Sequence, residues 1–277
     1  MTYFSAFLLG LVQGVAEFLP ISSSGHLAIA QNLLGMKEAG AIPEFFDVLL
    51  HLGTLLAVFV AYWQDICDMV LEFFRGAGDL IHRTTPTPVP PARRMIVLIV
   101  IATLPLFAVL PIRKTVQGLS NNMIFIGAAL IATGFLLFFS DRVRRGRKTE
   151  RSARLLDVFL VGVAQAVATC PGISRSGSTI TGGRLCGFTR EDAVRFSFLM
   201  SMPAILGACV LELPDFFSAG VPAELVAPCI AGALAAFLVG LGAIKLLQFF
   251  ARKKGFTLFS AYTVLVGAAA VIADLCL

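Results

Sequence analysis

The chain has 277 residues, of which 57% are hydrophobic and 14% charged, and its mean hydropathy is +0.87. An ordinary soluble domain has about 25% charged residues, so this composition excludes a disordered chain, a coiled coil and a typical cytosolic enzyme. It predicts an all-α polytopic membrane protein. The surplus of Lys and Arg that gives the net charge of +5 lies mainly in the predicted loops. This distribution is typical of a signal for membrane topology, so we expect no nucleic-acid partner.

Two apolar segments, residues 4–35 and 157–187, are interrupted by the sequences PISSSGH (20–26) and CPGISRSG (170–177). Pro, Gly and Ser end a helix, and each arm is too short to cross about 30 Å of hydrocarbon comfortably. Both segments are therefore predicted to be re-entrant helix hairpins with tips inside the membrane. Six further segments are long enough to be transmembrane helices, and they cover residues 44–63, 94–112, 121–140, 191–211, 223–249 and 257–276.

The two interrupted segments resemble each other. Residues 13–25 (QGVAEFLPISSSG) and 165–177 (QAVATCPGISRSG) are identical at seven of thirteen positions. Because the matches extend into both arms, we predict a single membrane domain, 1–277, made of two repeats, 1–150 and 151–277. Each repeat is one hairpin followed by three spans. An odd number of spans inverts the second copy, which gives an inverted-topology repeat.

Loop charges orient the chain. With both termini on one side of the membrane, fifteen of the 22 Lys and Arg residues fall on the opposite side. Only Lys37, Arg113 and Lys114 fall on the side of the termini. Cytoplasmic loops carry the excess of Lys and Arg, so both termini are predicted to lie outside. The first hairpin then enters from outside and the second from the cytoplasm, and their tips can meet near the middle.

Glu17 lies in an apolar arm of the first hairpin, where an ionisable side chain is costly and is a functional candidate. Gln13 lies one helical turn earlier on the same face, and Gly10 and Gly14 permit close helix packing nearby. A carboxylate and an amide together offer oxygen ligands to a divalent cation. A buried structural hydrogen-bonded pair is the alternative.

The first break supplies Ser22, Ser23, Ser24, Gly25 and His26. Hydroxyls and free N–H groups at the start of a short helix suit an anion. His26 can act as an acid, a base or a nucleophile, and a hydroxyl beside it can be an activated nucleophile. The alternative is a histidine that satisfies a local polar contact.

The second break places Arg175 among Ser174, Ser176 and Gly177. A guanidinium in a membrane needs an anionic partner, which either Glu17 or a ligand phosphate can supply. The two halves therefore differ. The first brings an acid, hydroxyls and an imidazole, and the second brings a cation and further hydroxyls, as a phosphoryl-transfer site requires.

Four motifs occur in order along nearly the whole chain: QGVAEFLPISSSGHL (13–27), DVLLHLGTLLAV (47–58), PGISRSGSTITGG (171–183) and FSFLMSMPA (196–204). With them the sequence resembles the undecaprenyl-diphosphatase family of the bacitracin-resistance type. The resemblance implies hydrolysis of undecaprenyl diphosphate to the monophosphate and inorganic phosphate, which recycles the lipid carrier of cell-wall synthesis. It also implies a bacterial inner membrane, an active site at its outer face, and a divalent cation, Mg²⁺ or Ca²⁺.

Carried over by position, the family's acidic motif falls on Gln13 and Glu17 as metal ligands. Its hydroxyl and imidazole fall on Ser23 and His26, and its phosphate-binding arginine falls on Arg175. Many members have Glu where this chain has Gln13, so the site here has one negative charge fewer.

The implied chemistry assigns roles to these residues. We expect Ser23 to attack the terminal phosphorus, His26 to move its proton, and Glu17 to hold the cation or to help activate the nucleophile. Whether Ser23, His26 or water attacks first is left open. Phosphate oxygens are expected to bind at Arg175 and at the residues of the two breaks, Ser22, Ser24, Gly25, Ser174, Ser176 and Gly177.

Expected partners are the polyprenyl diphosphate and membrane lipids, with bacitracin as a competitor for the substrate, and a homodimer is left open.

Asp47 and His51, one turn apart in the first span, either line the site, bind an ion or have packing roles. The rival function is a polyprenyl-phosphate flippase or secondary transporter, because broken helices in inverted repeats are a transporter design. Type-2 phosphatidic-acid phosphatases are excluded, because Thr181 stands where their motif has His.

Overall fold

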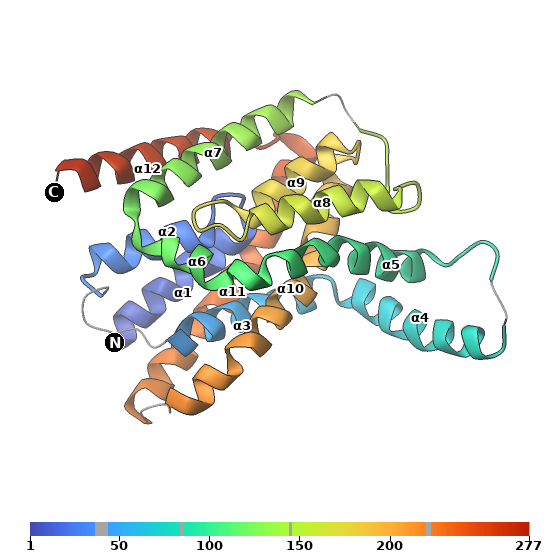
Figure 1. Cartoon of the computed structure of the whole chain (residues 1–277), viewed down its shortest axis with the longest axis horizontal. Helices are drawn as coiled ribbons and strands as arrows, with labels where there is room; N and C mark the ends of the chain where they lie inside the picture. Colours follow the sequence, from blue (N-terminus) through green and yellow to red (C-terminus); the bar gives the residue numbers. More distant parts are fainter. Residues whose placement is uncertain (37–43, 84–85, 144–145, 220–222, 277) are drawn as a thin grey trace.

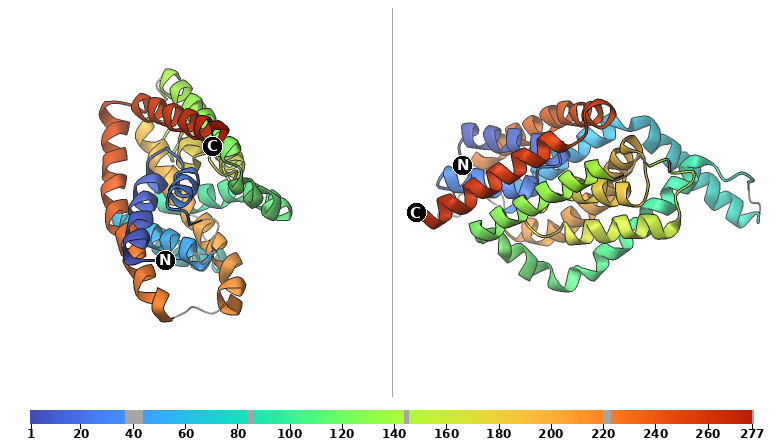
Figure 2. Two further views of the ribbon diagram at one scale, coloured as in Figure 1. Left: turned by 90° about the vertical axis from the view of Figure 1, so that its left-hand side faces the viewer. Right: turned by 90° about the horizontal axis from the view of Figure 1, so that it is seen from above.

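The computed structural model describes residues 1–36, 44–83, 86–143, 146–219 and 223–276, and these fold into an all-α protein (Figure 1). Most helices run along the long axis of the molecule, and both termini lie at the same end (Figures 1 and 2).

Each interrupted segment forms two helices around its break, as predicted. The first gives α1 (Tyr3–Phe18) and α2 (Ser23–Leu33), and the second gives α8 (Leu155–Val167) and α9 (Arg175–Leu185). With 16 and 13 residues, α1 and α8 are apolar but shorter than a membrane-spanning helix.

Five helical segments of the described chain are long and apolar enough to cross a membrane, and each overlaps a predicted span. The first, Pro91–Asn121, consists of α5 (Pro91–Thr103), short 3₁₀ turns and α6 (Arg113–Gly118). The others lie in α7 (Met123–Arg142), α10 (Arg190–Ala219), α11 (Ala223–Lys253) and α12 (Thr257–Cys276).

The remaining predicted span, 44–63, differs from the straight helix that we expected. It forms α3 (Glu44–Ala61), after which the chain bends by 84° into α4 (Trp63–Ile81). The pair counts as a sixth candidate span only if both helices are taken together. Side by side, α4 and α5 project from the end opposite the termini (Figure 1).

Ion pairs hold this projection together. Arg93 at the start of α5 donates to Glu72 Oε2 at 3.1 Å, and its Nη1 lies 2.7 Å from Asp79 Oδ2. Both carboxylates belong to α4, so the two helices are joined along their polar faces.

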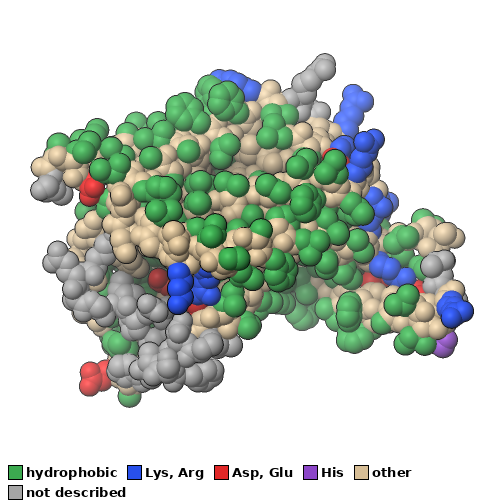
Figure 3. Space-filling view, in the orientation of Figure 1, with side chains coloured by type: hydrophobic (Ala, Val, Ile, Leu, Met, Phe, Trp, Pro, Cys, Tyr) green, Lys and Arg blue, Asp and Glu red, His purple; other side chains and the backbone are tan. Residues whose placement is uncertain are grey.

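Basic side chains gather at one end of the molecule. In Figure 3 most of the visible Lys and Arg lie toward the end from which α4 and α5 project. Many of these residues pair with acidic ones there: Lys148 Nζ lies 2.7 Å from Asp157 Oδ2, and Arg190 Nη2 lies 3.0 Å from Asp141 Oδ1. Three residues of the charge prediction, Lys37, Arg144 and Arg145, lie outside the described residues.

A close helix contact joins α1 to α11. A Cβ atom at Gly10 would lie 2.2 Å from the Gly232 carbonyl oxygen, so the two backbones touch here and a larger residue has no room. Close approach at small residues is a common way for membrane helices to associate. The predicted close packing at Gly10 is confirmed, and α1 is thereby fixed against a long candidate span.

Replacing Gly10 with alanine is therefore expected to destabilise the protein. The added methyl group overpacks the α1–α11 contact, which costs about 1–3 kcal/mol. Gly242→Ala is the matched control, because a Cβ at Gly242 of α11 meets nothing within 4 Å. Thermal unfolding in detergent should show a lower Tm for Gly10→Ala alone. Equal melting temperatures for the two variants would contradict the packing described.

Candidate active site

The two helix breaks meet inside the molecule. The N–H of Gly172 in the second break donates to Ser24 Oγ in the first at 3.2 Å. Ser176 Oγ donates in the other direction, to the carbonyl oxygen of Leu19 at 3.3 Å. Residues about 150 positions apart in the chain thus form one site, and the predicted meeting of the hairpin tips is confirmed.

The second break is anchored on α7. Thr133 Oγ1 accepts from the Ser174 N–H at 3.0 Å and donates to the Gly172 carbonyl oxygen at 3.3 Å. Gly172 has φ +86°, and a Cβ there would lie 2.7 Å from Ala129 Cβ and 2.8 Å from the Ile126 carbonyl oxygen. Only glycine allows both this conformation and this close approach to α7.

Glu17 is the centre of the site. It is buried, and its Oε1 forms an ion pair with Arg175 Nη2 across the two breaks. Its Oε2 accepts from Ser23 Oγ at 2.7 Å and from Gln13 Nε2 at 3.2 Å. His51 Nε2 of α3 lies 3.8 Å from the same oxygen, so His51 lines the site, one of the roles considered for it. The carboxylate therefore holds the candidate nucleophile and the candidate phosphate ligand together.

Two serines cap the short helices in the same way. Ser22 Oγ accepts from the Gly25 N–H at 3.3 Å at the start of α2, and Ser174 Oγ accepts from the Gly177 N–H at 3.1 Å at the start of α9. Serine is a favoured N-cap residue for this reason. Ser22 has φ 74°, which costs a non-glycine residue about 1–3 kcal/mol. In this structure the Gly25 and Gly177 N–H groups are thus used within the breaks.

The other hydroxyl groups lie next to these caps. Ser24 Oγ is 3.3 Å from Ser22 Oγ, and Ser176 Oγ is 3.2 Å from Ser174 Oγ. The N–H groups of Ser23 and Ser24, at the start of α2, donate to no other residue of the described chain. These two donors remain available to an anion at the helix N-terminus.

Both ring nitrogens of His26 are bound to groups other than the Ser23 hydroxyl. Its Nδ1 lies 2.8 Å from the Ser22 carbonyl oxygen, and its Nε2 lies 3.0 Å from Tyr262 Oη. The Ser23 hydroxyl donates to Glu17 instead. In this structure Glu17, rather than His26, is the group that can accept the Ser23 proton.

Two buried atoms in the site have no hydrogen-bond partner among the described residues. One is Arg175 Nη1, a cationic donor suited to a phosphate oxygen, and the other is Gln13 Oε1. Gln13 Oε1 and the Glu17 carboxylate are oxygen ligands of the kind that divalent cations take. Within the described ranges no group of three His, Cys, Asp or Glu side chains forms a metal site by itself.

Sequence reasoning missed two residues of the site, Thr133 and Tyr262. Thr133 is a fully buried hydroxyl in an otherwise apolar span, and that isolated polar position was a usable signal. Tyr262 lies 236 residues from His26, and nothing in the local pattern of α12 marks it.

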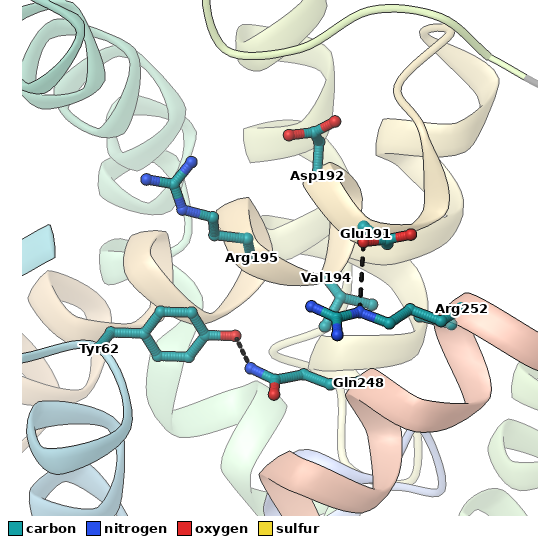
Figure 4. A pocket seen from close by; sticks show the side chains of 8 residues that line it. Tyr62, Glu191, Asp192, Val194, Arg195, Gln248 and Arg252 are labelled. Carbon is teal, nitrogen blue, oxygen red and sulfur yellow. Dashed lines mark hydrogen bonds and ion pairs between the residues drawn. The ribbon is translucent and has the colours of Figure 1, made fainter.

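A cavity of about 270 Å³ lies away from this site (Figure 4). Tyr62, Arg195, Gln248, Glu191 and Arg252 are among the residues that line it. Its polar groups largely satisfy one another: Gln248 Nε2 donates to Tyr62 Oη at 3.0 Å, and Arg252 Nε lies 3.3 Å from Glu191 Oε2. The cavity contains none of the predicted site residues, so we do not place the chemistry there.

The anchoring role of Thr133 can be measured with Thr133→Val. This change leaves the buried Ser174 N–H without its acceptor, which is expected to cost about 1–3 kcal/mol and to lower the activity of the site. Thr263→Val is the matched control, because Thr263 is equally buried but donates only to carbonyls of its own helix. If chemical or thermal unfolding shows the same stability for both variants, Thr133 does not hold the second break.

Comparison with known proteins identifies the family of the chain. Residues 6–269 match the family described as Bacitracin resistance protein BacA. The undecaprenyl-diphosphatase of Alkaliphilus metalliredigens is 41% identical over 276 residues, which are 99% of this chain and all of that protein. Those of Syntrophotalea carbinolica and Moorella thermoacetica are 42% and 40% identical, over 96% and 97% of this chain and 97% and 96% of their own lengths. The chain therefore belongs to the BacA family of undecaprenyl-diphosphatases.

Proposed function

We propose that the chain hydrolyses undecaprenyl diphosphate to undecaprenyl phosphate and inorganic phosphate where its two helix breaks meet. The observation that carries this proposal is the Glu17 carboxylate, which binds the Ser23 hydroxyl on one oxygen and the Arg175 guanidinium on the other. A nucleophile, its base and a phosphate ligand are thus in one place. The family and the full-length relatives support the same reaction.

In the first step Ser23 Oγ attacks the terminal phosphorus and passes its proton to Glu17 Oε2, 2.7 Å away. Arg175 neutralises the charge on the transferred phosphoryl group through Nη1, and polyprenyl phosphate leaves. Phosphoryl transfer depends mainly on such positioning and charge neutralisation.

In the second step water attacks the phosphoserine and inorganic phosphate leaves. His26 takes the proton of this water at Nε2, because Nδ1 faces the Ser22 carbonyl oxygen. Ser23 Oγ recovers its proton from Glu17. His26 then releases this proton to solvent, so each of the two basic groups serves a separate step and is restored.

The remaining residues of the breaks bind the phosphate groups and keep the two breaks in position. The free N–H groups of Ser23 and Ser24 bind phosphate oxygens at the N-terminus of α2. One helix cap is formed by Ser22 and Gly25, and the other by Ser174, Ser176 and Gly177. These caps keep the tips of both hairpins in position around the diphosphate.

Gln13 Oε1 and the Glu17 carboxylate would hold a divalent cation, Mg²⁺ or Ca²⁺, beside the diphosphate. The cation would supply charge neutralisation to the phosphate oxygens. Since Gln13 brings no charge, the protein would offer it a single carboxylate.

The architecture that we propose for this site is an inverted-topology repeat in a single membrane domain, 1–277. Two observations support it. The first residues of α2 and α9 are 152 positions apart in the chain, and so are their last residues. The serines that cap the two helices are 152 positions apart as well. The basic end of the molecule lies in the cytoplasm and both termini lie outside a plasma membrane, in keeping with the positive-inside rule. The site opens to the outer face.

A transporter remains the rival, and three aromatic rings bear on it. Phe18, next to Glu17, packs on Phe198 with ring centroids 5.4 Å apart, and Phe198 packs on Tyr62 at 5.9 Å. All three are buried, and Tyr62 lines the cavity of Figure 4. These rings form a chain of buried aromatic contacts from Phe18 to the cavity. A hydrolase needs access from one side only, whereas a transporter must open a path through such packing.

Phosphate release separates the two functions. Purified wild type should release phosphate from a polyprenyl diphosphate with Mg²⁺ or Ca²⁺ and not with EDTA. Glu17→Gln should lower the rate by about 100-fold or more, because it removes a general base. Glu72→Gln is the matched control: Glu72 also pairs with arginines, but in α4, away from the site.

Two outcomes contradict this account, the first its reaction and the second its base. One is a folded wild type that moves polyprenyl phosphate across liposomes and releases no phosphate, which favours the transporter. The other is a Glu17→Gln variant as active as Glu72→Gln, which removes Glu17 from the reaction.

The nucleophile is identified by acid-quenching a reaction with substrate labelled with ³²P in the terminal phosphate. The label should appear on Ser23 and disappear in Ser23→Ala, while Ser24→Ala still forms the adduct because its Ser23–Glu17 contact is intact. Label on His26 overturns the role of Ser23. Absence of label at every quench time favours direct attack by water.

A further inference from the structure

We propose that Tyr262 acts through His26: its hydroxyl group fixes Nε2 as the atom that takes up the proton, passes the proton on to it and stays bound to it afterwards. The inference rests on the hydrolysis proposed above and adds to it a residue from the last helix, far from both breaks. It starts from the contact between His26 Nε2 and Tyr262 Oη at 3.0 Å.

The contacts of His26 fix the state of its ring. The Ser22 carbonyl oxygen, 2.8 Å from Nδ1, can only accept a hydrogen bond, so Nδ1 carries the proton of the neutral imidazole. Nε2 then presents a lone pair, and the Tyr262 hydroxyl donates to it. The second nitrogen of a histidine is commonly set by the hydrogen bond that the first one makes.

The two rings also restrict each other. Their centroids are 5.6 Å apart and their planes are inclined by only 11°, which is a stacked arrangement. Stacking adds about 0.5–1.5 kcal/mol to such a pair beyond the area that it buries. The imidazole is therefore held by a carbonyl group on one nitrogen, a hydroxyl group on the other and a ring face.

Tyr262 is itself held by the packing of α12 on α7, which lie side by side in Figure 1. Ser260 Oγ donates to the Gly134 carbonyl oxygen of α7 at 2.7 Å. Thr263, the next residue after Tyr262, is fully buried. The hydroxyl group is thus presented from a helix outside the hairpin that carries His26.

A phenol is suited to both protonation states of His26. In the second step the water oxygen bonds to phosphorus, the bond from phosphorus to Ser23 Oγ breaks, and that oxygen takes the proton held by Glu17. The proton of the water passes to the Tyr262 oxygen as the hydrogen of that hydroxyl group moves to His26 Nε2. The phenol oxygen then accepts from Nε2–H, since a hydroxyl is both donor and acceptor. Phenylalanine keeps the ring and loses both interactions.

The test compares Tyr262→Phe with Tyr62→Phe in the full-length purified protein. Each removes one hydroxyl whose hydrogen bond is 3.0 Å long, but that of Tyr62 goes to Gln248 beside the cavity. Tyr262→Phe should lower kcat by about 3- to 10-fold, the typical value of one hydrogen bond, and leave KM unchanged. Tyr62→Phe should keep the wild-type kcat.

The ring state is read directly by ¹⁵N NMR of histidine-labelled protein, with His26→Gln to assign the signal. In wild type His26 should show a protonated Nδ1 and a hydrogen-bonded Nε2. In Tyr262→Phe the Nε2 resonance should move toward that of a free ring nitrogen. This signal reports the hydrogen bond itself, so it separates loss of that bond from a loss of activity caused by lower stability.

Three results would overturn the proposal. Equal kcat values for the two variants, or an Nε2 resonance that Tyr262→Phe does not move, remove Tyr262 from the reaction while hydrolysis by the wild type stands. A change in KM with kcat intact gives Tyr262 a role in substrate binding instead. If the wild type releases no phosphate, the proposed function fails first and this inference fails with it.

Discussion

The buried ion pair between Glu17 and Arg175 is the interaction on which the rest of the site depends. A carboxylate in an apolar interior is costly unless it is paired and hydrogen-bonded, and removing one partner of a buried pair typically costs about 3–5 kcal/mol. The two partners come from opposite halves of the chain. Each helix break therefore needs the other, and both must lie at the same depth.

This requirement explains much of the surrounding structure. Gly10 lets α1, which carries Glu17, touch the backbone of α11, and Thr133 ties the break that carries Arg175 to α7. The breaks are strained at Ser22 and closely packed at Gly172. Both tips are thus held by long apolar helices, and the polar groups that they expose converge on one place. Strain of this kind persists only where the surroundings hold it.

Local sequence carried the information for the breaks and the spans. Pro, Gly and Ser inside apolar runs marked both hairpins, and an isolated Glu and Arg marked the centre of the site. The helix α4 was missed because Asp65, Asp68, Glu72 and Asp79 make it polar on one side, so its residues resemble a loop when only hydropathy is considered. No Pro or Gly stands at the 84° bend before it, so the local sequence does not mark the bend.

The proton partner of Ser23 shows where sequence reasoning ends. His26 is three residues away, which suggested that it takes the Ser23 proton. The structure instead satisfies Nδ1 with a backbone carbonyl of its own helix start and Nε2 with Tyr262, while Glu17 bonds Ser23. Such a choice between two bases depends on contacts across 236 residues, and no local pattern encodes it. The assignment of separate steps to Glu17 and His26 follows from that geometry.

The most direct measurement is an experimental structure with a non-hydrolysable methylene analogue of the polyprenyl diphosphate bound. The account predicts the terminal phosphorus next to Ser23 Oγ, with a phosphate oxygen on Arg175 and the polyprenyl chain leaving toward lipid. A diphosphate group bound in the cavity beside Tyr62 and Arg195, with the two breaks free of it, would contradict the claim that the meeting of the breaks is the active site.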